Sequence, residues 1–91
     1  MTNIIWSSKF KRDFLREFRN DKQIISLLVP VVADLSRGIP LDKKYRDHAL
    51  SGDMRPCRDC HIKPDLVLIY SILPDGRLSL ERLGSHSQLE L

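Results

Sequence analysis

The three histidines of this chain all fall in its second half, and each lies close to charged or polar residues. The strings are Tyr45-Arg46-Asp47-His48, Arg58-Asp59-Cys60-His61 and Arg82-Leu83-Gly84-Ser85-His86. Histidine is the side chain whose ordinary pKa, about 6.5, lets it accept or donate a proton near neutral pH. Cutting RNA without a metal ion needs such a base and acid, with cations to stabilise charge on the phosphate. The residue types therefore predict an RNA-cleaving site, against the alternative of scattered surface histidines.

If residues 57–62 form a strand, side chains around His61 point alternately to the two faces of the sheet. One face then takes Cys57, Asp59 and His61, and the other takes Arg58, Cys60 and Ile62. Asp59 can orient the ring of His61 and stabilise its charged form. Asp65, across a turn at Lys63-Pro64, lies within reach of the same site. From the residues alone, a functional cluster and an ordinary polar turn explain this pattern equally well, because turns also collect Asp and His.

The cysteine pair Cys57 and Cys60 offers competing functions. With His61 it forms the C-x-x-C-H string of c-type haem attachment, but that haem is attached outside the cytoplasm. A zinc site with His48 would need a knuckle turn, because positions three apart in a strand point to opposite faces. A thioredoxin-like role needs a helix directly after the pair, and none is predicted here. Two reduced structural thiols are the favoured interpretation.

Composition narrows the class of protein without naming a function. Ninety-one residues, 42% hydrophobic and 30% charged, predict a single globular domain over residues 1–91. The net charge of +3 is a mild bias toward anionic partners. No apolar run approaches the roughly 20 residues of a membrane span, and the first ten residues lack the apolar core of a signal peptide. We therefore expect a cytoplasmic protein with no membrane partner.

The first half of the chain is predicted to be helical after a short strand at residues 3–6. Ser7 or Ser8 can cap a first helix, whose apolar face is formed by Phe10, Phe14 and Phe18. The opposite face carries Lys9, Arg12, Arg16 and Arg19, and is interpreted as its solvated side. A second helix is capped at Asp21 and ends at Gly38, with an apolar stripe at Ile24, Leu27, Leu28, Val31 and Leu35. Pro30 lies inside it and should bend or break it.

The second half is predicted to be a loop followed by three strands. Residues 39–56 are mostly loop, and residues 57–62, 65–71 and 77–84 have strand character. Turns at Lys63-Pro64 and Pro74-Asp75-Gly76 join these strands. The order β-α-α-β-β-β predicts an α+β fold, with two helices packed on one face of an antiparallel sheet. The other face is left free for function.

The order of these motifs resembles that of a known family. Residues 45–52, 58–70 and 82–87 contain the pattern D-H-x-L-x-G … R-D-x-H-I-x-P-D … R-x-G-x-H. This combination strongly resembles the YafQ-like branch of the RelE superfamily, the toxins of bacterial type II toxin–antitoxin pairs. The resemblance implies a RelE-like α+β fold and a ribosome-dependent endoribonuclease, an mRNA interferase that works without a cofactor. It also implies a cognate antitoxin as partner, with DNA contacted only through that antitoxin.

The resemblance implies roles for individual residues as well. The family's active-site histidines fall on His48, His61 and His86, and its acidic residue falls on Asp65. We expect His86 to be the general acid, His61 or His48 to be the base or to position it, and Asp65 to act as base or to orient a histidine. Asp59 is expected to support this site, and no metal ligand is expected. The cations expected to bind phosphate or RNA are Arg82, Lys63, Arg58, Lys43, Lys44 and Arg46, although strand alternation puts Arg58 on the face opposite His61.

The end of the chain departs from the family pattern. Family members typically carry a Leu-Phe pair just after the last histidine, and here the corresponding pair is Leu89-Glu90. A carboxylate cannot stack on a base, and it repels phosphate. A second hypothesis is therefore a catalytically weak relative that mainly binds its antitoxin and helps to repress their operon. A third is a small zinc or redox protein built on Cys57 and Cys60.

Overall fold

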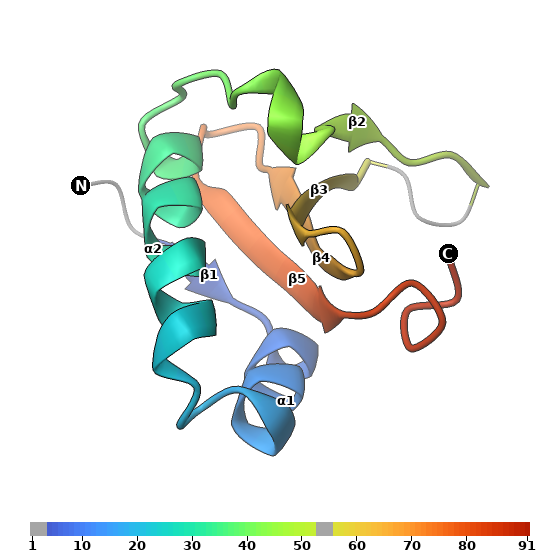
Figure 1. The fold of residues 1–91 in the computed structure, drawn as a ribbon. Coiled ribbons are helices and arrows are strands. Elements are labelled where there is room, and N and C mark those ends of the chain that lie inside the picture. Colours follow the sequence, from blue (N-terminus) through green and yellow to red (C-terminus); the bar gives the residue numbers. More distant parts are fainter. Residues whose placement is uncertain (1–3, 53–55) are drawn as a thin grey trace.

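The computed structural model describes residues 4–52 and 56–91, which form a five-stranded sheet with two helices (Figure 1). The elements follow one another as β1 (Ile5–Trp6), α1 (Ser8–Glu17), α2 (Lys22–Ser36), the 3-10 helix η1 (Lys43–Tyr45), β2 (His48–Ala49), β3 (Arg58–Lys63), β4 (Leu66–Ile72) and β5 (Leu78–Gly84). The strands lie in the order β1-β5-β4-β3-β2. The predicted α+β fold is confirmed, with strands β3 to β5 starting one residue later than the sequence suggested.

Two strand pairings differ from the simple antiparallel meander. β1 pairs with β5 in parallel, so the sheet is mixed at this edge. Residues 48–49, expected in a loop, form the short strand β2, in which His48 pairs with Asp59 and Ala49 with Arg58. A segment of two residues is too short to show the alternation by which a strand is recognised in a sequence. The strand forms because these residues pair with β3. β2 thereby extends the sheet on the side where the histidines lie.

The two helices begin where the sequence predicted. The side chain of Ser7 accepts the N–H of Phe10, and the side chain of Asp21 accepts the N–H of Ile24, each at 3.0 Å. These bonds satisfy N–H groups that have no partner within a helix, which is why Ser and Asp are preferred there. The caps fix where α1 and α2 start relative to the sheet.

The sequence predicted a bend or a break at Pro30, and helix α2 continues through this residue without a break. A proline inside a helix costs about 3 kcal/mol, whereas full burial of one large apolar side chain contributes about 1.5–3 kcal/mol. Ile24 and Leu28 are buried on one side of the proline, and Val31 and Leu35 on the other. Their combined packing outweighs the local cost and keeps the helix in one piece.

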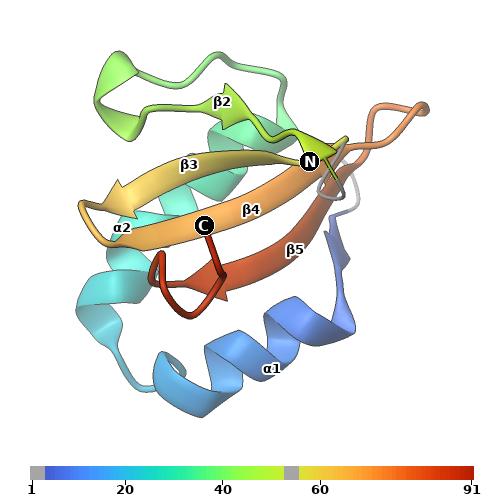
Figure 2. The same cartoon turned by 90° about the vertical axis from the view of Figure 1, so that its right-hand side faces the viewer.

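The main core lies between the helices and one face of the sheet. Phe10 and the buried face of α2 pack there against residues such as Cys60, Leu68 and Leu80. Leu27, expected in this core, is instead 38% exposed. In Figure 2, α2 lies behind the sheet and α1 runs along its β5 edge, while the front face carries the C-terminal segment.

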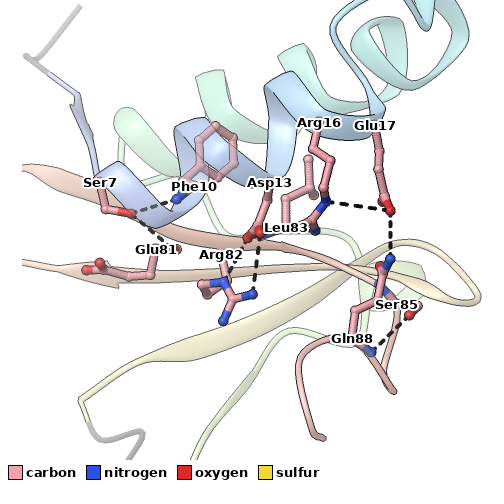
Figure 3. A network of polar contacts seen from close by, with 10 residues as sticks. All are labelled: Ser7, Phe10, Asp13, Arg16, Glu17, Glu81, Arg82, Leu83, Ser85 and Gln88. Carbon is pink, nitrogen blue, oxygen red and sulfur yellow. Dashed lines mark hydrogen bonds and ion pairs between the residues drawn. The ribbon is translucent and has the colours of Figure 1, made fainter.

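Helix α1 takes over the edge of β5 where β1 ends. β1 pairs with β5 only through Ile5 and Trp6. The next residue, Ser7, donates its N–H to the carbonyl of Leu80 at 3.1 Å and its hydroxyl to the carbonyl of Glu81 at 2.9 Å. An unpaired strand edge is a liability in a folded protein, and here side chains of α1 cover it (Figure 3).

Among the described residues, no helix is long and apolar enough to cross a membrane.

The cysteines provide a test of the two faces of β3. Cys60 is buried in the main core, and burial raises the pKa of its thiol to about 12. Cys57 packs against the small cluster on the other face, and burial also raises the pKa of its thiol. We expect a thiol reagent at neutral pH to label Cys57 slowly and Cys60 not at all, because the thiolate is the reactive form.

Mass spectrometry of the labelled native protein checks this prediction. Both cysteines should react in denaturant, and the Cys57→Ser variant should show no labelling while folded. Rapid native labelling of Cys60 would contradict the assignment of that side chain to the core.

Candidate active site

The three histidines gather on the face of the sheet that the helices leave open. His48 lies opposite Asp59 across the β2–β3 pairing, and its Nδ1 is 2.9 Å from Asp59 Oδ1. The ring centroid of His61 is 6.4 Å from that of His48 and 5.0 Å from that of His86. Asp59 and His61 share this face, as strand alternation predicted. The structure thus brings together side chains from β2, β3 and the C-terminal segment, with His61 in the middle.

Asp59 is a buried carboxylate beneath this cluster, with its side chain only 5% exposed. His48 Nδ1 also lies 2.8 Å from the carbonyl oxygen of Arg46, in hydrogen-bonding geometry. One Nδ1 carries at most one hydrogen, and when the Arg46 carbonyl accepts it, Asp59 Oδ1 has no hydrogen-bond partner in the described part of the chain. Burial raises the pKa of Asp59, and positive charge on the three histidines opposes that rise. The charge of Asp59 is therefore coupled to the protonation of the histidines around it.

His61 is suited to accept a proton. Burial lowers its pKa below the usual 6.5, Asp59 acts in the opposite direction, and positive charge on His86, Arg46 and His48 lowers it further. The imidazole of His61 is therefore mostly neutral at pH 7. A neutral ring has a free nitrogen lone pair, which a general base needs.

His86 is held by Asp65 through two contacts. Asp65 Oδ1 accepts the backbone N–H of His86 at 3.0 Å and lies 2.6 Å from the His86 ring nitrogen Nδ1. The backbone and side-chain hydrogen bonds from His86 lower the pKa of Asp65, so this carboxylate is ionised at neutral pH. An ionised carboxylate requires Nδ1 to donate, which leaves Nε2 as the ring nitrogen available to a substrate. This geometry favours Asp65 as the group that orients His86 over Asp65 as a base.

The C-terminal segment is anchored on the open face by one apolar side chain. Leu89 is buried and packs against Val67 and Ile69, which point away from the helices. Glu90 follows it with a φ of 58° and is exposed. The segment therefore reaches the site through His86 and Leu89, while the carboxylate at position 90 faces solvent.

Three of the predicted cations line a pocket beside His61. The pocket has a volume of about 400 Å³, and its polar lining includes Lys44, Arg46, His61 and Lys63. Lys43 is exposed in η1 next to this pocket but does not line it. The remaining lining residues are Leu27, Tyr45, Ile62 and Pro64. Loop and strand residues distant in sequence thus place positive charge in a pocket beside one histidine, which suits a phosphate group.

Arg58 is separated from the histidine cluster. Its Nε lies 3.1 Å from Asp47 Oδ1, and the same oxygen accepts the hydroxyl of Tyr70 at 2.6 Å. Tyr70 belongs to the core on the helix side of the sheet. Arg58 therefore lies on the face opposite His61, as strand alternation predicted, and its expected role as a phosphate ligand stays a prediction.

Arg82 lies on the open face but is tied to helix α1. Asp59, Ile69 and Arg82 are cross-strand neighbours in one row of the sheet. The guanidinium of Arg82 donates to Asp13 at 2.8 Å through Nε and at 3.3 Å through Nη2. Asp13 was not recognised as a site residue from the sequence. The only available signal was a carboxylate among the basic residues of α1.

The positions of Cys57 and Cys60 do not support the hypothesis of a zinc site. Cys60 lies in the main core and Cys57 packs on the opposite face, so the pair cannot share one ion. Across residues 4–52 and 56–91, no group of three or more His, Cys, Asp or Glu side chains is arranged to hold a metal ion. Because the two thiols lie on opposite faces of β3, the zinc and redox hypotheses built on this pair are dropped.

The fold is that of a RelE-like α+β protein. A family model described as "Bacterial toxin of type II toxin-antitoxin system, YafQ" matches residues 2–91. The chain is 32% identical over 87 residues to the mRNA interferase toxin YafQ of Escherichia coli K12, covering 96% of this chain and 94% of that protein. This chain belongs to the YafQ family of type II toxin–antitoxin toxins.

Solved structures agree with this assignment. A metal-bound toxin from Helicobacter pylori is 43% identical and superposes with a TM-score of 0.86, with 98% of this chain and 99% of that chain covered. A chain of the Escherichia coli DinJ–YafQ complex is 31% identical, with a TM-score of 0.73 and 98% of each chain covered. The predicted fold and family are therefore confirmed over nearly the whole chain, including the helical half, which lies outside the motifs of the sequence resemblance.

The coupling between Asp59 and His61 can be measured directly. We expect an NMR titration to give a His61 pKa below 6.5 in the wild type and a still lower value in Asp59→Asn, because removing the negative charge disfavours the imidazolium. Asp75→Asn, in the exposed turn between β4 and β5, removes a carboxylate paired with Arg77 and should leave the His61 titration unchanged. A His61 pKa that rises in Asp59→Asn would refute the proposed electrostatic coupling.

Proposed function

We propose that this protein is a ribosome-dependent endoribonuclease that cuts mRNA by histidine acid–base chemistry and is held inactive by a cognate antitoxin. The observation that carries the proposal is the pair His61 and His86, 5.0 Å apart between ring centroids on the open face. One ring is mostly neutral near pH 7, and the other is oriented by a carboxylate through Nδ1. A base and an acid of this kind are what RNA cleavage requires.

Cleavage then proceeds by attack of a ribose 2′-oxygen on the adjacent phosphorus. His61 takes the proton of the 2′-hydroxyl as the new P–O bond forms. His86 donates a proton from Nε2 to the 5′-oxygen as the P–O5′ bond breaks. The products are a 2′,3′-cyclic phosphate and a free 5′-hydroxyl, and the two histidines exchange protonation states.

The other residues of the site bind and position. Lys44, Arg46 and Lys63 stabilise negative charge on the phosphate from the pocket beside His61. His48, between Asp59 and the Arg46 carbonyl, is a positioning group at the β2 edge of the cluster. Arg82 contributes positive charge at the β5 edge of the same face.

The partners follow from the family and from the charge of the site. The Escherichia coli relative forms a complex with DinJ. We infer a cognate antitoxin here that covers the basic open face with an acidic or apolar segment, and contact with DNA only through that antitoxin. Because the substrate is mRNA under translation, the cytoplasm is the place of action.

A second candidate is a catalytically weak relative that mainly binds its antitoxin. Glu90 favours it, because this exposed carboxylate stands where family members typically carry an aromatic ring beside the active site. Tight antitoxin binding without mRNA cleavage would support this candidate. The Glu90→Phe variant separates the two, since it should increase cleavage if the missing ring limits activity.

The first test is primer extension on mRNA in a translating extract, with wild type compared to His86→Ala. We expect ribosome-dependent cuts with the wild type and a decrease of about 10²–10⁴-fold in the variant, the usual contribution of a general acid. Antitoxin binding by His86→Ala shows that the variant is folded, and Asp75→Asn serves as an active control. Intact mRNA with saturating wild type would favour the second candidate, and undiminished cuts with His86→Ala would remove His86 from the chemistry.

A further inference from the structure

Asp13 is the most buried charged side chain of helix α1, and all its described contacts lead to strand β5 or stay within the helix. The residue is 1% exposed. Its Oδ2 accepts Arg82 Nε at 2.8 Å and the backbone N–H of Leu83 at 3.0 Å, and its Oδ1 accepts Arg82 Nη2 at 3.3 Å. Arg16, one turn along the helix, lies at the limit of hydrogen bonding at 3.5 Å. Figure 3 shows the carboxylate of Asp13 pointing from α1 toward Arg82.

This carboxylate is charged at neutral pH. Burial alone would raise the pKa of Asp13, but the hydrogen bonds from Arg82 and Leu83 outweigh it, so the pKa is lowered. A charged pair with two parallel N–H···O contacts is both stronger and more directional than a neutral hydrogen bond. The guanidinium of Arg82 is therefore held in one orientation rather than sampling many rotamers.

The orientation of the Arg82 guanidinium determines which of its N–H groups remain free to bind a ligand. Asp13 engages the Nε–Nη2 side of the guanidinium, and the Arg82 side chain remains 29% exposed. Arg82 lies on the open face in the same row as Asp59. The remaining guanidinium N–H groups are thus available on the surface that carries the histidines, and arginine is well suited to bind phosphate.

Helix α1 makes a second contact with the site one turn further along. Glu17 accepts Gln88 Nε2 at 2.8 Å, and Gln88 Oε1 accepts the N–H of Ser85 at 2.9 Å. A Cβ on Gly84 would lie only 2.9 Å from that Gln88 oxygen, so glycine leaves the room this contact needs. The helix is therefore fixed to the sheet edge on both sides of Arg82, at Ser7 and at the segment that carries His86 (Figure 3).

We propose that Asp13 is a positioning residue of the RNA site, which fixes the guanidinium of Arg82 so that its open side binds the phosphate backbone of mRNA. The inference rests on the proposed function, and Asp13 itself touches no substrate. A purely structural alternative exists, in which Asp13 only closes the β5 edge through the N–H of Leu83. The Asp13→Asn substitution retains an acceptor of the same shape for that N–H and removes the charge that orients Arg82.

The experiment measures the affinity for ribosome-bound mRNA in the His86→Ala background, where no cutting is needed. We expect Asp13→Asn and Arg82→Ala each to weaken binding roughly 10-fold, the effect of losing one charge-assisted contact. The double variant should bind no more weakly than Arg82→Ala alone, because Asp13 acts through Arg82. Asp75→Asn, which removes an arginine–carboxylate pair at the far turn, should bind as the parent does.

Each contrary result has a defined meaning. Unchanged affinity in Asp13→Asn, or losses that multiply in the double variant, would overturn the positioning role, and melting temperatures show whether the variants are folded. If Asp13→Asn does not fold, Arg82→Lys tests the same idea, since it keeps a charge near Asp13 but not the oriented guanidinium, and parental affinity would refute the proposal. Absence of mRNA cleavage by the wild type would count against the proposed function, whereas these affinities decide the role of Asp13.

Discussion

The register between β3 and β4 determines which side chains of this protein are buried and which are available for chemistry. Cys60 pairs with Leu68 and both enter the core, while Asp59 pairs with Ile69 and His61 with Val67 on the other face. A shift of one residue would exchange the two faces of a strand. His61 would then lie under the helices and Cys60 on the open side. The histidine cluster therefore exists only in this register, and the packing of α2 against Cys60 and Leu68 enforces it.

Two further constraints complete the site on that face. The pairing of β4 with β5 shifts after Ile69, so that Ile69 lies opposite Arg82 and Tyr70 opposite Leu80. Glu81 is the extra residue on β5 at this shift. Because of it, Arg82 lies on the open face, while Leu80 and Leu83 both lie in the core. β1 pairs with only a short part of β5. Beyond it, helix α1 lies along the edge of β5 and contacts this strand through side chains. The same helix thus supports the core with Phe10 and the site with Asp13.

Much of this could be predicted from the sequence, because local signals and tertiary packing agree. The helix caps, the β3–β4–β5 meander and the shared face of Asp59 and His61 follow from turn residues and period-two alternation. The continuity of α2 through Pro30 could not be predicted, since it depends on burial on both sides of the proline. The strand β2 has only two residues, and their pairing partners on β3 lie 11 and 9 positions away in sequence. The role of Asp13 depends on contacts with β5 about 70 residues later, which no local pattern reveals.

The most direct test of the mechanism is the cleavage of ribosome-bound mRNA that carries a single 2′-deoxynucleotide at the mapped cut site. If the 2′-oxygen is the nucleophile that His61 activates, cleavage at that position should disappear while unmodified mRNA is cut to a 2′,3′-cyclic phosphate. Cleavage of the deoxy-substituted message at the same position and rate would show that the 2′-hydroxyl does not take part, and would contradict histidine acid–base catalysis at this site.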